Sequence, residues 1–245
     1  MTWYSSKDVA YVFWNHCTIT GFLNAVRIKT TAKLVDTTGL GDTWREMSDT
    51  GLREGELEMT GLYDGDVLAE NGMNTVSATD RVASVLLEGN TVSKRFYGFQ
   101  KAILSGTEVG ISSDSVHTST PVYTMRGAID HGYVVAPWAA RTTAGNTQAT
   151  YADAGASMTA PRAYLNITGL TLGGYTNLVV TVQSCATSDG SYDDETAFTA
   201  VTAASTGSQC ITLSGAVNRY LAVKWAWTGA GTGQSASFFV GVAPA

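Results

Sequence analysis

Two segments in the first third of the chain show a strict alternation of apolar and charged residues. Within residues 25–35 an apolar or small set alternates with a largely basic set: Val26, Ile28, Thr30, Ala32 and Leu34 against Arg27, Lys29, Thr31 and Lys33. Residues 52–62 alternate in the same way, with Glu54, Glu56 and Glu58 against Leu57 and Met59. A period of two residues predicts β-strands that have one face against a core and the other in water.

The charges of these two segments are complementary. If the strands pair antiparallel, the glutamate row lies opposite the Arg/Lys row, and each opposed pair contributes about 0.2–1 kcal/mol, whereas like charges would cost a similar amount. We therefore expect residues 25–35 and 52–62 to pair antiparallel in this register.

The segment between the two strands is rich in turn residues. Residues 37–44 contain two glycines, and Asp42 is placed to cap a short helical turn over residues 43–47. This segment is expected to form a loop that extends from the strand pair.

One other helix is predicted, at residues 79–88. Thr79 is a suitable N-cap, Val82, Val85 and Leu86 share one side, and Gly89 follows the last turn. Because the segment is short, its stability would have to come from packing on a sheet.

The remainder of the chain predicts strands separated by turn residues. They are expected at residues 9–14, 93–99, 102–104, 108–111, 122–127 and 132–136, then at 163–170, 178–184, 197–201, 209–213, 219–227 and 235–242. Residues 142–160 are small and polar, as in a linker or long loop. The expected fold class is mainly β, with a sandwich or barrel and one short flanking helix in residues 1–145, and an Ig-like or jelly-roll β-sandwich in residues 146–245.

Composition and charge exclude several classes of function. The formal net charge is −6 and the pI about 5.0, which argues against a protein that grips nucleic acid by neutralising phosphates. We find no basic segment followed by a long apolar run at the start and no apolar run near 18 residues, so neither a secretory signal nor membrane insertion is expected. The three cysteines, Cys17, Cys185 and Cys210, are not at metal-binding spacing and are expected to be free thiols.

The residues that could carry catalysis are scattered. His131 follows Asp130, and His117 lies two residues after Ser115, but no G-x-S-x-G turn accompanies either histidine. A hydrolase that works through His131 or His117 is therefore a remote alternative, and neither catalytic residues nor a cofactor are expected.

Two further features have binding alternatives. The acidic loop with Asp189, Asp193, Asp194 and Glu195 could hold Ca²⁺, although it lacks EF-hand spacing and a solvated loop is favoured over a metal site. The aromatic residues of the second half could form a sugar-stacking platform, although Trp225 and Trp227, which share a strand face, are favoured as core. The aromatic set is Trp138, Tyr164, Tyr175, Tyr192, Trp225 and Trp227.

Several short motifs resemble the major tail tube protein of long, non-contractile-tailed bacteriophages. In the first half they are residues 21–26 (GFLNAV), 36–46 (DTTGLGDTWRE), 51–57 (GLREGEL), 61–64 (GLYD) and the stretch from Asp130 to Ala136. The second half resembles the added β domain of such proteins, through residues 163–167 (AYLNI), 182–184 (VQS), 189–190 (DG) and 219–221 (RYL).

This resemblance implies a structural virion protein without enzymatic activity. Subunits of the family form stacked rings, usually hexameric, around a tape-measure protein and joined to tail-end proteins, and viral DNA passes transiently and without sequence preference down the bore. The implied location is the virion tail, after assembly in the host cytoplasm, with residues 146–245 on the tube exterior. The alternative is a carbohydrate-binding virion or surface module that uses the C-terminal domain.

The resemblance also suggests roles for the strand pair and its loop. The lumen-lining candidates are Arg27, Lys29, Lys33, Glu54, Glu56 and Glu58. The candidates for contacts between subunits or rings are Thr37, Thr38, Leu40, Asp42, Trp44 and Arg45.

Overall fold

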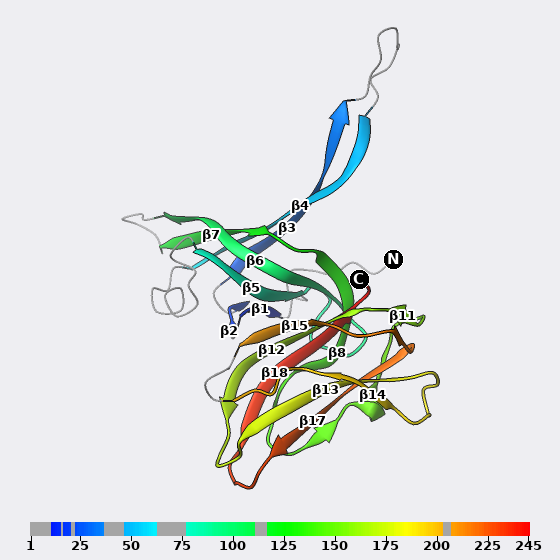
Figure 1. Ribbon diagram of the computed structural model, residues 1–245. Helices are drawn as coiled ribbons and strands as arrows, with labels where there is room; N and C mark the ends of the chain where they lie inside the picture. Colours follow the sequence, from blue (N-terminus) through cyan, green and yellow to red (C-terminus); the bar gives the residue numbers. More distant parts are fainter. Residues whose placement is uncertain are drawn as a thin grey trace. The chain divides into compact units, whose positions relative to one another are not determined.

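The computed structural model describes residues 11–15, 17–20, 23–36, 47–62, 77–110, 117–202 and 207–245. Within these ranges the named elements are β-strands, apart from one 3₁₀ turn, η2 (Gln148–Thr150), and the strands pair antiparallel (Figure 1). The mainly β fold class is therefore confirmed.

The chain divides into two compact units. Unit 1 consists of Met1–Gly21, Arg81–Lys101 and Ile129–Ala245, and unit 2 of Phe22–Asp80 and Ala102–Ala128. The predicted division into one domain of residues 1–145 and another of residues 146–245 stays a prediction.

Unit 2 is built around three consecutive antiparallel pairings. Strand β3 pairs with β4, β4 with β7, and β7 with the second part of β6. The core of this unit includes Leu57, Met59, Leu104 and Tyr123, whose side chains are buried. The strands involved are β3 (Leu23–Asp36), β4 (Met47–Leu62), β6 (Arg95–Gly110) and β7 (Thr118–Met125).

Unit 1 contains a β-sandwich. One layer has the strand order β15-β12-β18-β8, and the other has the order β10-β17-β13-β14. Short strands β9 and β10 pair with β17, and β11 pairs with β16. The strands are β8 (Ile129–Arg141), β9 (Gly145–Asn146), β10 (Ala152–Asp153), β11 (Met158–Thr159), β12 (Arg162–Thr171), β13 (Asn177–Cys185), β14 (Asp193–Ala197), β15 (Ser208–Thr212), β16 (Ala216–Val217), β17 (Tyr220–Thr228) and β18 (Ser235–Ala243).

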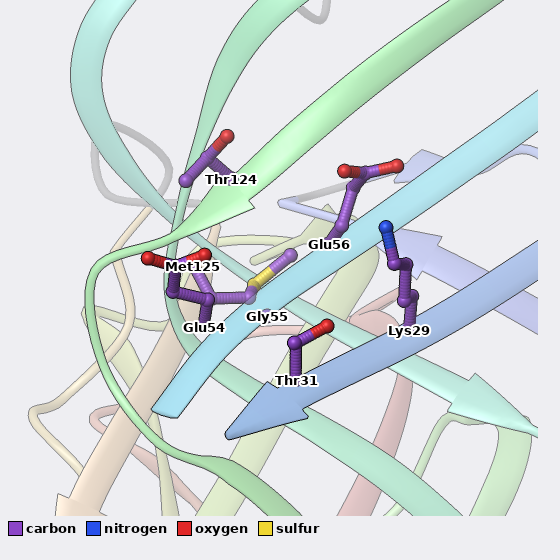
Figure 2. Close-up of a pocket in the computed structure, with 7 residues that line it drawn as sticks. All are labelled: Lys29, Thr31, Glu54, Gly55, Glu56, Thr124 and Met125. Atoms are coloured by element: carbon purple, nitrogen blue, oxygen red, sulfur yellow. The ribbon is translucent and has the colours of Figure 1, made fainter. Parts of the chain in front are cut away.

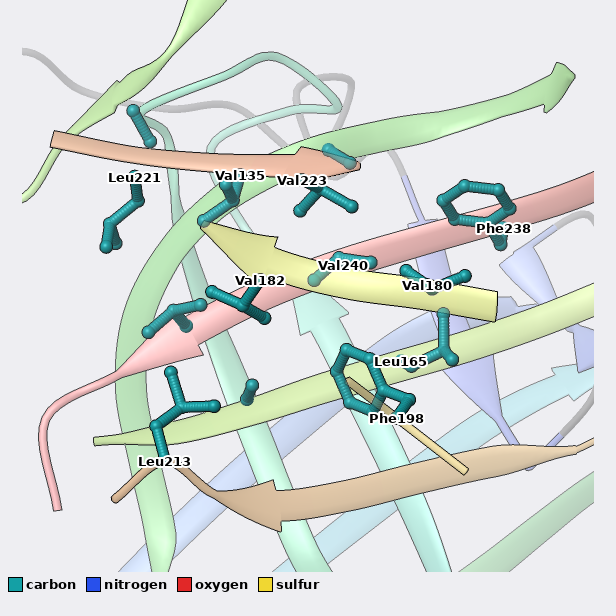
Figure 3. Close-up of a cluster of buried hydrophobic side chains, with 14 of the residues drawn as sticks. Val135, Leu165, Val180, Val182, Phe198, Leu213, Leu221, Val223, Phe238 and Val240 are labelled. Atoms are coloured by element: carbon teal, nitrogen blue, oxygen red, sulfur yellow. The ribbon is translucent and has the colours of Figure 1, made fainter. Parts of the chain in front are cut away.

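The two layers of the sandwich enclose one apolar cluster. Val180 and Val182 of β13 meet residues of the opposite layer such as Leu165 and Val240, and all are essentially inaccessible to solvent (Figure 3). Burying a side chain of this size contributes about 1.5–3 kcal/mol. Because every second side chain of these strands points into this cluster, the residues at those positions are apolar.

The β12-β18-β8 layer is also covered on its other face. Phe96, Tyr164 and Phe239 belong to a second buried cluster, in which Phe13 of β1 (Tyr11–Trp14) stacks on Phe239 at a centroid distance of 5.3 Å. Strand β1 pairs with β2 (Cys17–Thr18) on one side and with β5 (Ser77–Leu86) on the other. The central strands of unit 1 thus have buried side chains on both faces.

The helix predicted at residues 79–88 is wrong, because the segment belongs to β5. Residues 83–86 pair with residues 11–14 of β1, and all four are buried, including Ser84, whose hydroxyl donates to Asn166 Oδ1 at 2.7 Å. A half-buried helix would expose part of this run, whereas a strand covered on both faces buries all of it. Pairing with β1 overrides a helical spacing of only three apolar residues.

Two other expectations about local structure are also corrected. The strands expected at 93–99, 102–104 and 108–111 form one strand over their described part, β6. Residues 142–160 are not a free linker, because β9 and β10 pair with β17 and the Thr147 N–H donates to the Val223 carbonyl at 2.9 Å. Small polar side chains suit such close pairing as well as they suit a linker.

The described residues also bear on the expected state of the cysteines and on membrane insertion. Cys17, Cys185 and Cys210 are not joined in a disulfide bond. No helix found in the described ranges has the length and apolar character needed to span a bilayer. The short helical turn expected at residues 43–47 lies outside the described residues except for Met47, which begins β4.

Gly132 of β8 offers a test of the close packing in unit 1. A Cβ at this position would clash with the Val242 carbonyl oxygen and would lie 2.6 Å from both the Ala243 Cβ and the Phe96 ring. Gly132→Ala is expected to lower the free energy of unfolding by about 1–3 kcal/mol, because a backbone atom cannot move aside. Urea denaturation measures the change.

The matched control for this substitution is Gly106→Ala. A Cβ at Gly106, at a register shift in β6, would meet nothing within 4 Å. Its unfolding free energy is expected to stay within about 0.5 kcal/mol of the original. Equal effects of the two substitutions would contradict the packing described for Gly132.

Candidate functional site

The charged strand pair has the predicted register. Arg27 lies opposite Glu58, Lys29 opposite Glu56, and Thr31 opposite Glu54. The expectation that residues 25–35 and 52–62 pair antiparallel with basic residues facing glutamates is therefore confirmed. Lys33 falls at a β-bulge between Ala32 and Leu34, where the register shifts, so the paired row ends before it.

The two faces of this pair differ in burial. Leu57 and Met59 of β4 are fully buried, and their partners Ile28 and Val26 of β3 are half-buried. On the opposite face Arg27 and Glu58 approach to 3.8 Å, with side chains 76% and 29% exposed. An exposed pair at this distance is worth about 1 kcal/mol at most, so this face is stabilised weakly and stays in contact with water.

A hollow on the charged face brings together residues of three strands. It is lined by Lys29 and Thr31 of β3, Glu54, Gly55 and Glu56 of β4, and Thr124 and Met125 of β7. Figure 2 shows Lys29 and Glu56 extending from neighbouring strands beside the hollow. Ammonium and carboxylate groups in this arrangement can hold water and counter-ions, but the lining contains neither a nucleophile with a base nor a metal-binding set.

The β3–β4 pair continues past the part of β4 that is paired with β7. Among the described strands β3 pairs with β4 alone, and β4 pairs with β7 only within residues 56–62 (Figure 1). Near the far end of β3, Leu34 and Val35 are 49% and 47% exposed. The strand pair thus presents an edge of β3 that pairs with no other described strand, and beside this edge the exposed apolar side chains of Leu34 and Val35.

The loop residues predicted to contact neighbouring subunits lie outside the described residues. This applies to all six candidates, Thr37, Thr38, Leu40, Asp42, Trp44 and Arg45. Their role stays a prediction.

The carboxylates of the acidic loop are partly used by the sandwich itself. Asp194 accepts hydrogen bonds from Lys224 Nζ at 2.5 Å and from Gln183 Nε2 at 2.7 Å, and these bonds lower the pKa of its carboxyl group. Glu195 accepts a hydrogen bond from Ser184, while Asp189 and Asp193 are exposed. The described residues contain no cluster of three or more His, Cys, Asp or Glu side chains arranged to hold a metal ion.

Asp130 and His131 do not form a catalytic pair, because successive residues of β8 point to opposite faces. Asp130 is buried and accepts hydrogen bonds from Tyr164 Oη and, at 2.6 Å, from Arg162 Nη1. His131 is exposed and lies 4.0 Å from the Tyr97 ring, and partial burial followed by the nearby Arg95 charge lowers its pKa. His117 is exposed, and Ser115 lies outside the described residues.

Most of the aromatic candidates for a sugar platform are structural. Trp225 and Trp227 pack against the sandwich core and Tyr164 is fully buried. Trp138 donates its indole N–H to Thr168 Oγ1 at 2.8 Å. Tyr175 lies against Trp227 with ring centroids 6.0 Å apart.

Tyr192 instead interacts electrostatically with Tyr151 and Tyr220, which belong to a group of residues that sequence reasoning missed. Tyr151 and Tyr220 pack edge to face at 5.2 Å, and Arg219 Nε donates to Asp153 Oδ1 at 2.6 Å. Pairing of β10 with β17 brings Tyr151 and Asp153 beside Arg219 and Tyr220. Because this pairing joins segments about 66 residues apart, no local pattern could have found the cluster.

Charge reversal tests the β3–β4 register. Glu56→Lys would place an ammonium group opposite that of Lys29 and is expected to lower the free energy of unfolding by about 0.5–1 kcal/mol. Adding Lys29→Glu should restore most of this loss, because it recreates an opposed pair. Urea denaturation of the single and double variants measures the coupling, and additive losses would contradict the register.

The Asp153–Arg219 ion pair predicts a pH dependence of stability. Hydrogen bonds from the Arg219 side chain and the Gly155 N–H lower the Asp153 pKa from 3.8 to about 2. Because the folded pKa is depressed, the stabilisation is present above the unfolded-state pKa and is lost as pH falls toward about 2. The stability difference between the original protein and Asp153→Asn should therefore shrink across this range.

Chemical denaturation between pH 6 and pH 2 measures this difference. Arg219→Gln is the matched control, since removal of either partner should abolish the same pH-dependent component. A difference that stayed constant over the whole range would contradict the proposed cause.

No protein-family model matches the sequence, and no curated protein does so either. Several solved structures are similar. A structure of the virion of a native gene transfer agent particle contains a chain 17% identical over 52% of this chain and 97% of its own length, with a TM-score of 0.42. The tail of an empty gene transfer agent particle, with C6 symmetry, contains one 16% identical over 51% and 96%, with a TM-score of 0.39.

The SPP1 Dit protein, described as a hub adsorption apparatus protein of phages that infect Gram-positive hosts, is similar over almost the whole chain. It is 13% identical and covers 95% of this chain and 98% of its own, with a TM-score of 0.38. The chain is thus similar to proteins of virions, virion tails and a phage hub. Because all three TM-scores lie below 0.5, these likenesses establish neither a shared family nor a shared function.

Proposed function

We propose that this protein is a structural subunit that polymerises into stacked rings and forms the tail tube of a non-contractile-tailed phage. The observation that carries the proposal is the β3–β4 pair, with its free edge, its exposed apolar end and its charged face. The tail-tube motifs in the sequence support it, because they cover this same pair. The protein acts by assembly and has no catalytic activity.

The free edge of β3 supports self-association. An edge strand exposes N–H and C=O groups that can pair with another chain, and soluble proteins normally protect such edges. Pairing of β3 with a neighbouring subunit would satisfy these groups and cover Leu34 and Val35. Repeated around a ring, the same contact closes the sheets into a continuous barrel without edges.

The charged face of the β3–β4 pair supports the proposal that this pair lines the channel of the tube. Basic and acidic side chains alternate across β3 and β4, and the net charge of the chain is −6. DNA would meet a wet surface that attracts it weakly, because tight binding requires an excess of positive charge. In this proposal the lumen is lined by Arg27, Lys29, Lys33, Glu54, Glu56 and Glu58.

The remaining parts of the proposal follow from the family resemblance. Rings are hexameric, stack around a tape-measure protein and end at tail-end proteins, and residues 37–45 contact a neighbouring subunit or ring. Residues 146–245 lie on the exterior of the tube. The protein assembles in the host cytoplasm and resides in the virion tail, where viral DNA passes through it during ejection.

Assembly of the purified protein tests the proposal. Negative-stain electron microscopy at increasing protein concentration should show rings or filaments of constant diameter. Leu34→Glu should abolish them, because a charged side chain would be buried at the contact between subunits. Its fold should survive, since Leu34 is 49% exposed in the single chain.

Val109→Glu is the matched control. Val109 of β6 is 44% exposed and also belongs to unit 2, but it lies outside the β3–β4 pair. This variant should assemble as the original protein does. A protein that remains a stable monomer at high concentration, by light scattering, would count decisively against the proposal.

A further inference from the structure

A group of polar and aromatic side chains in unit 1 takes no part in the strand pair described above. It consists of Tyr151, Asp153, Tyr192, Arg219 and Tyr220, here called the tyrosine–arginine cluster. Strand β10 carries Asp153, β17 begins at Tyr220, and these two residues lie opposite each other in the β10–β17 pairing.

The ion pair of the cluster is held rigidly. Arg219 donates from Nε to Asp153 Oδ1 and from Nη2 to Asp153 Oδ2, each at 2.6 Å, and the Gly155 N–H donates to Oδ1 at 2.8 Å. The two side chains are still 43% and 38% exposed. A planar fork of this kind is preorganised, so a ligand would not have to order it on binding.

Aromatic rings adjoin this fork. The Arg219 guanidinium carbon lies 5.1 Å from the centroid of the Tyr220 ring, and Tyr151 packs edge to face on Tyr220. Burial, with smaller electrostatic effects of Cys185, Tyr151 and Tyr220, raises the pKa of the Tyr192 hydroxyl to about 12. The Tyr192 hydroxyl oxygen is buried and has no hydrogen-bond partner among the described residues.

These tyrosines lie outside the sandwich core. Tyr151, Tyr192 and Tyr220 are half-buried, and none belongs to the core cluster against which Trp225 and Trp227 pack. The cluster therefore combines partly accessible aromatic rings with a hydrogen-bonded ion pair.

We propose that the tyrosine–arginine cluster binds a neutral glycan. The apolar C–H face of a pyranose ring would pack on the tyrosine rings, and its hydroxyls, which both donate and accept, would bond to the Asp153 carboxylate and to the guanidinium N–H groups not used by it. A hydroxyl pair suits this site because one fork presents an acceptor and a donor side by side.

The same residues argue against other ligand classes. A charged ligand would gain little net attraction, because the charges of Asp153 and Arg219 neutralise each other within one ion pair. A purely apolar ligand would desolvate the fork without replacing its hydrogen bonds to water. A neutral polyhydroxyl compound avoids both disadvantages.

An array of immobilised neutral oligosaccharides tests the proposal with the full-length protein. The array should include glucose, galactose, mannose, rhamnose and N-acetylhexosamine oligomers, and the best binder is then titrated in solution by calorimetry. Tyr151→Ala and Arg219→Lys are each expected to weaken binding by about tenfold or more, through loss of a stacking surface and of the fork. Circular dichroism checks that each variant folds.

Tyr175→Ala is the matched control, because Tyr175 also packs on an aromatic side chain of unit 1 but lies outside the cluster. It should bind the glycan as the original protein does. If Tyr151→Ala fails to fold, Arg219→Lys, which keeps the positive charge, decides the question alone.

The proposal is overturned if no neutral glycan on the array binds, or if binding survives both cluster substitutions or is lost equally in Tyr175→Ala. It is independent of ring assembly. Variants of the cluster should still form rings in the microscope, and a failure of the protein to assemble would leave the glycan result unaffected.

Discussion

Unpaired backbone groups are the constraint on which the rest of this structure depends. In a β-sheet the backbone N–H and C=O groups of each strand pair with its neighbours, and at the sheet edge one row of these groups has no neighbouring strand. In unit 1 short segments solve part of this problem, since β9 and β10 lie along β17 and β2 lies along β1. In unit 2 the described strands leave β3 paired on one side only.

The difference between these edges is reflected in the side chains beside them. Strand β14, at one end of the second sandwich layer, carries Asp193, Asp194 and Glu195, and charges on an edge discourage pairing with another chain. Strand β3 has basic residues on one face but carries Leu34 and Val35 near its end, and their exposure gives association an apolar contribution. Only β3 among these two edges is suited to a partner, which is why the proposed assembly centres on it.

Close packing on both faces of the β12-β18-β8 layer limits which substitutions unit 1 can tolerate. One face meets the sandwich core and the other meets the cluster of Phe13, Phe96, Tyr164 and Phe239. The Tyr164 ring packs against Gly98, and its hydroxyl donates a hydrogen bond to buried Asp130. Asp130 also forms an ion pair with Arg162, so these residues depend on one another. Most ionisable groups of this layer are therefore structural, and the partly accessible cluster around Arg219 stands apart from them.

Local pattern alone determined the strand pair. The two-residue alternation of charge in residues 25–35 and 52–62 predicted both strands, their faces and the opposition of basic residues to glutamates, and the structure assigns the individual pairs. The same reasoning located five strands of the sandwich, β12, β13, β15, β17 and β18, to within one residue at each end, since each has one face in the core, whereas β14 covers residues 193–197 and not the predicted 197–201. It also identified Trp225 and Trp227 as residues packed on that core.

Tertiary structure decided what depends on contacts between distant segments. Residues 83–86 form a strand because β1 pairs with them, although their apolar spacing alone favoured a helix. Residues 142–160 are held by β17, and the Asp153–Arg219 fork exists only because of that pairing. Pairing partners far apart in the chain leave no local periodicity, so the sequence by itself determined the faces of individual strands, and only the fold determined which strands meet.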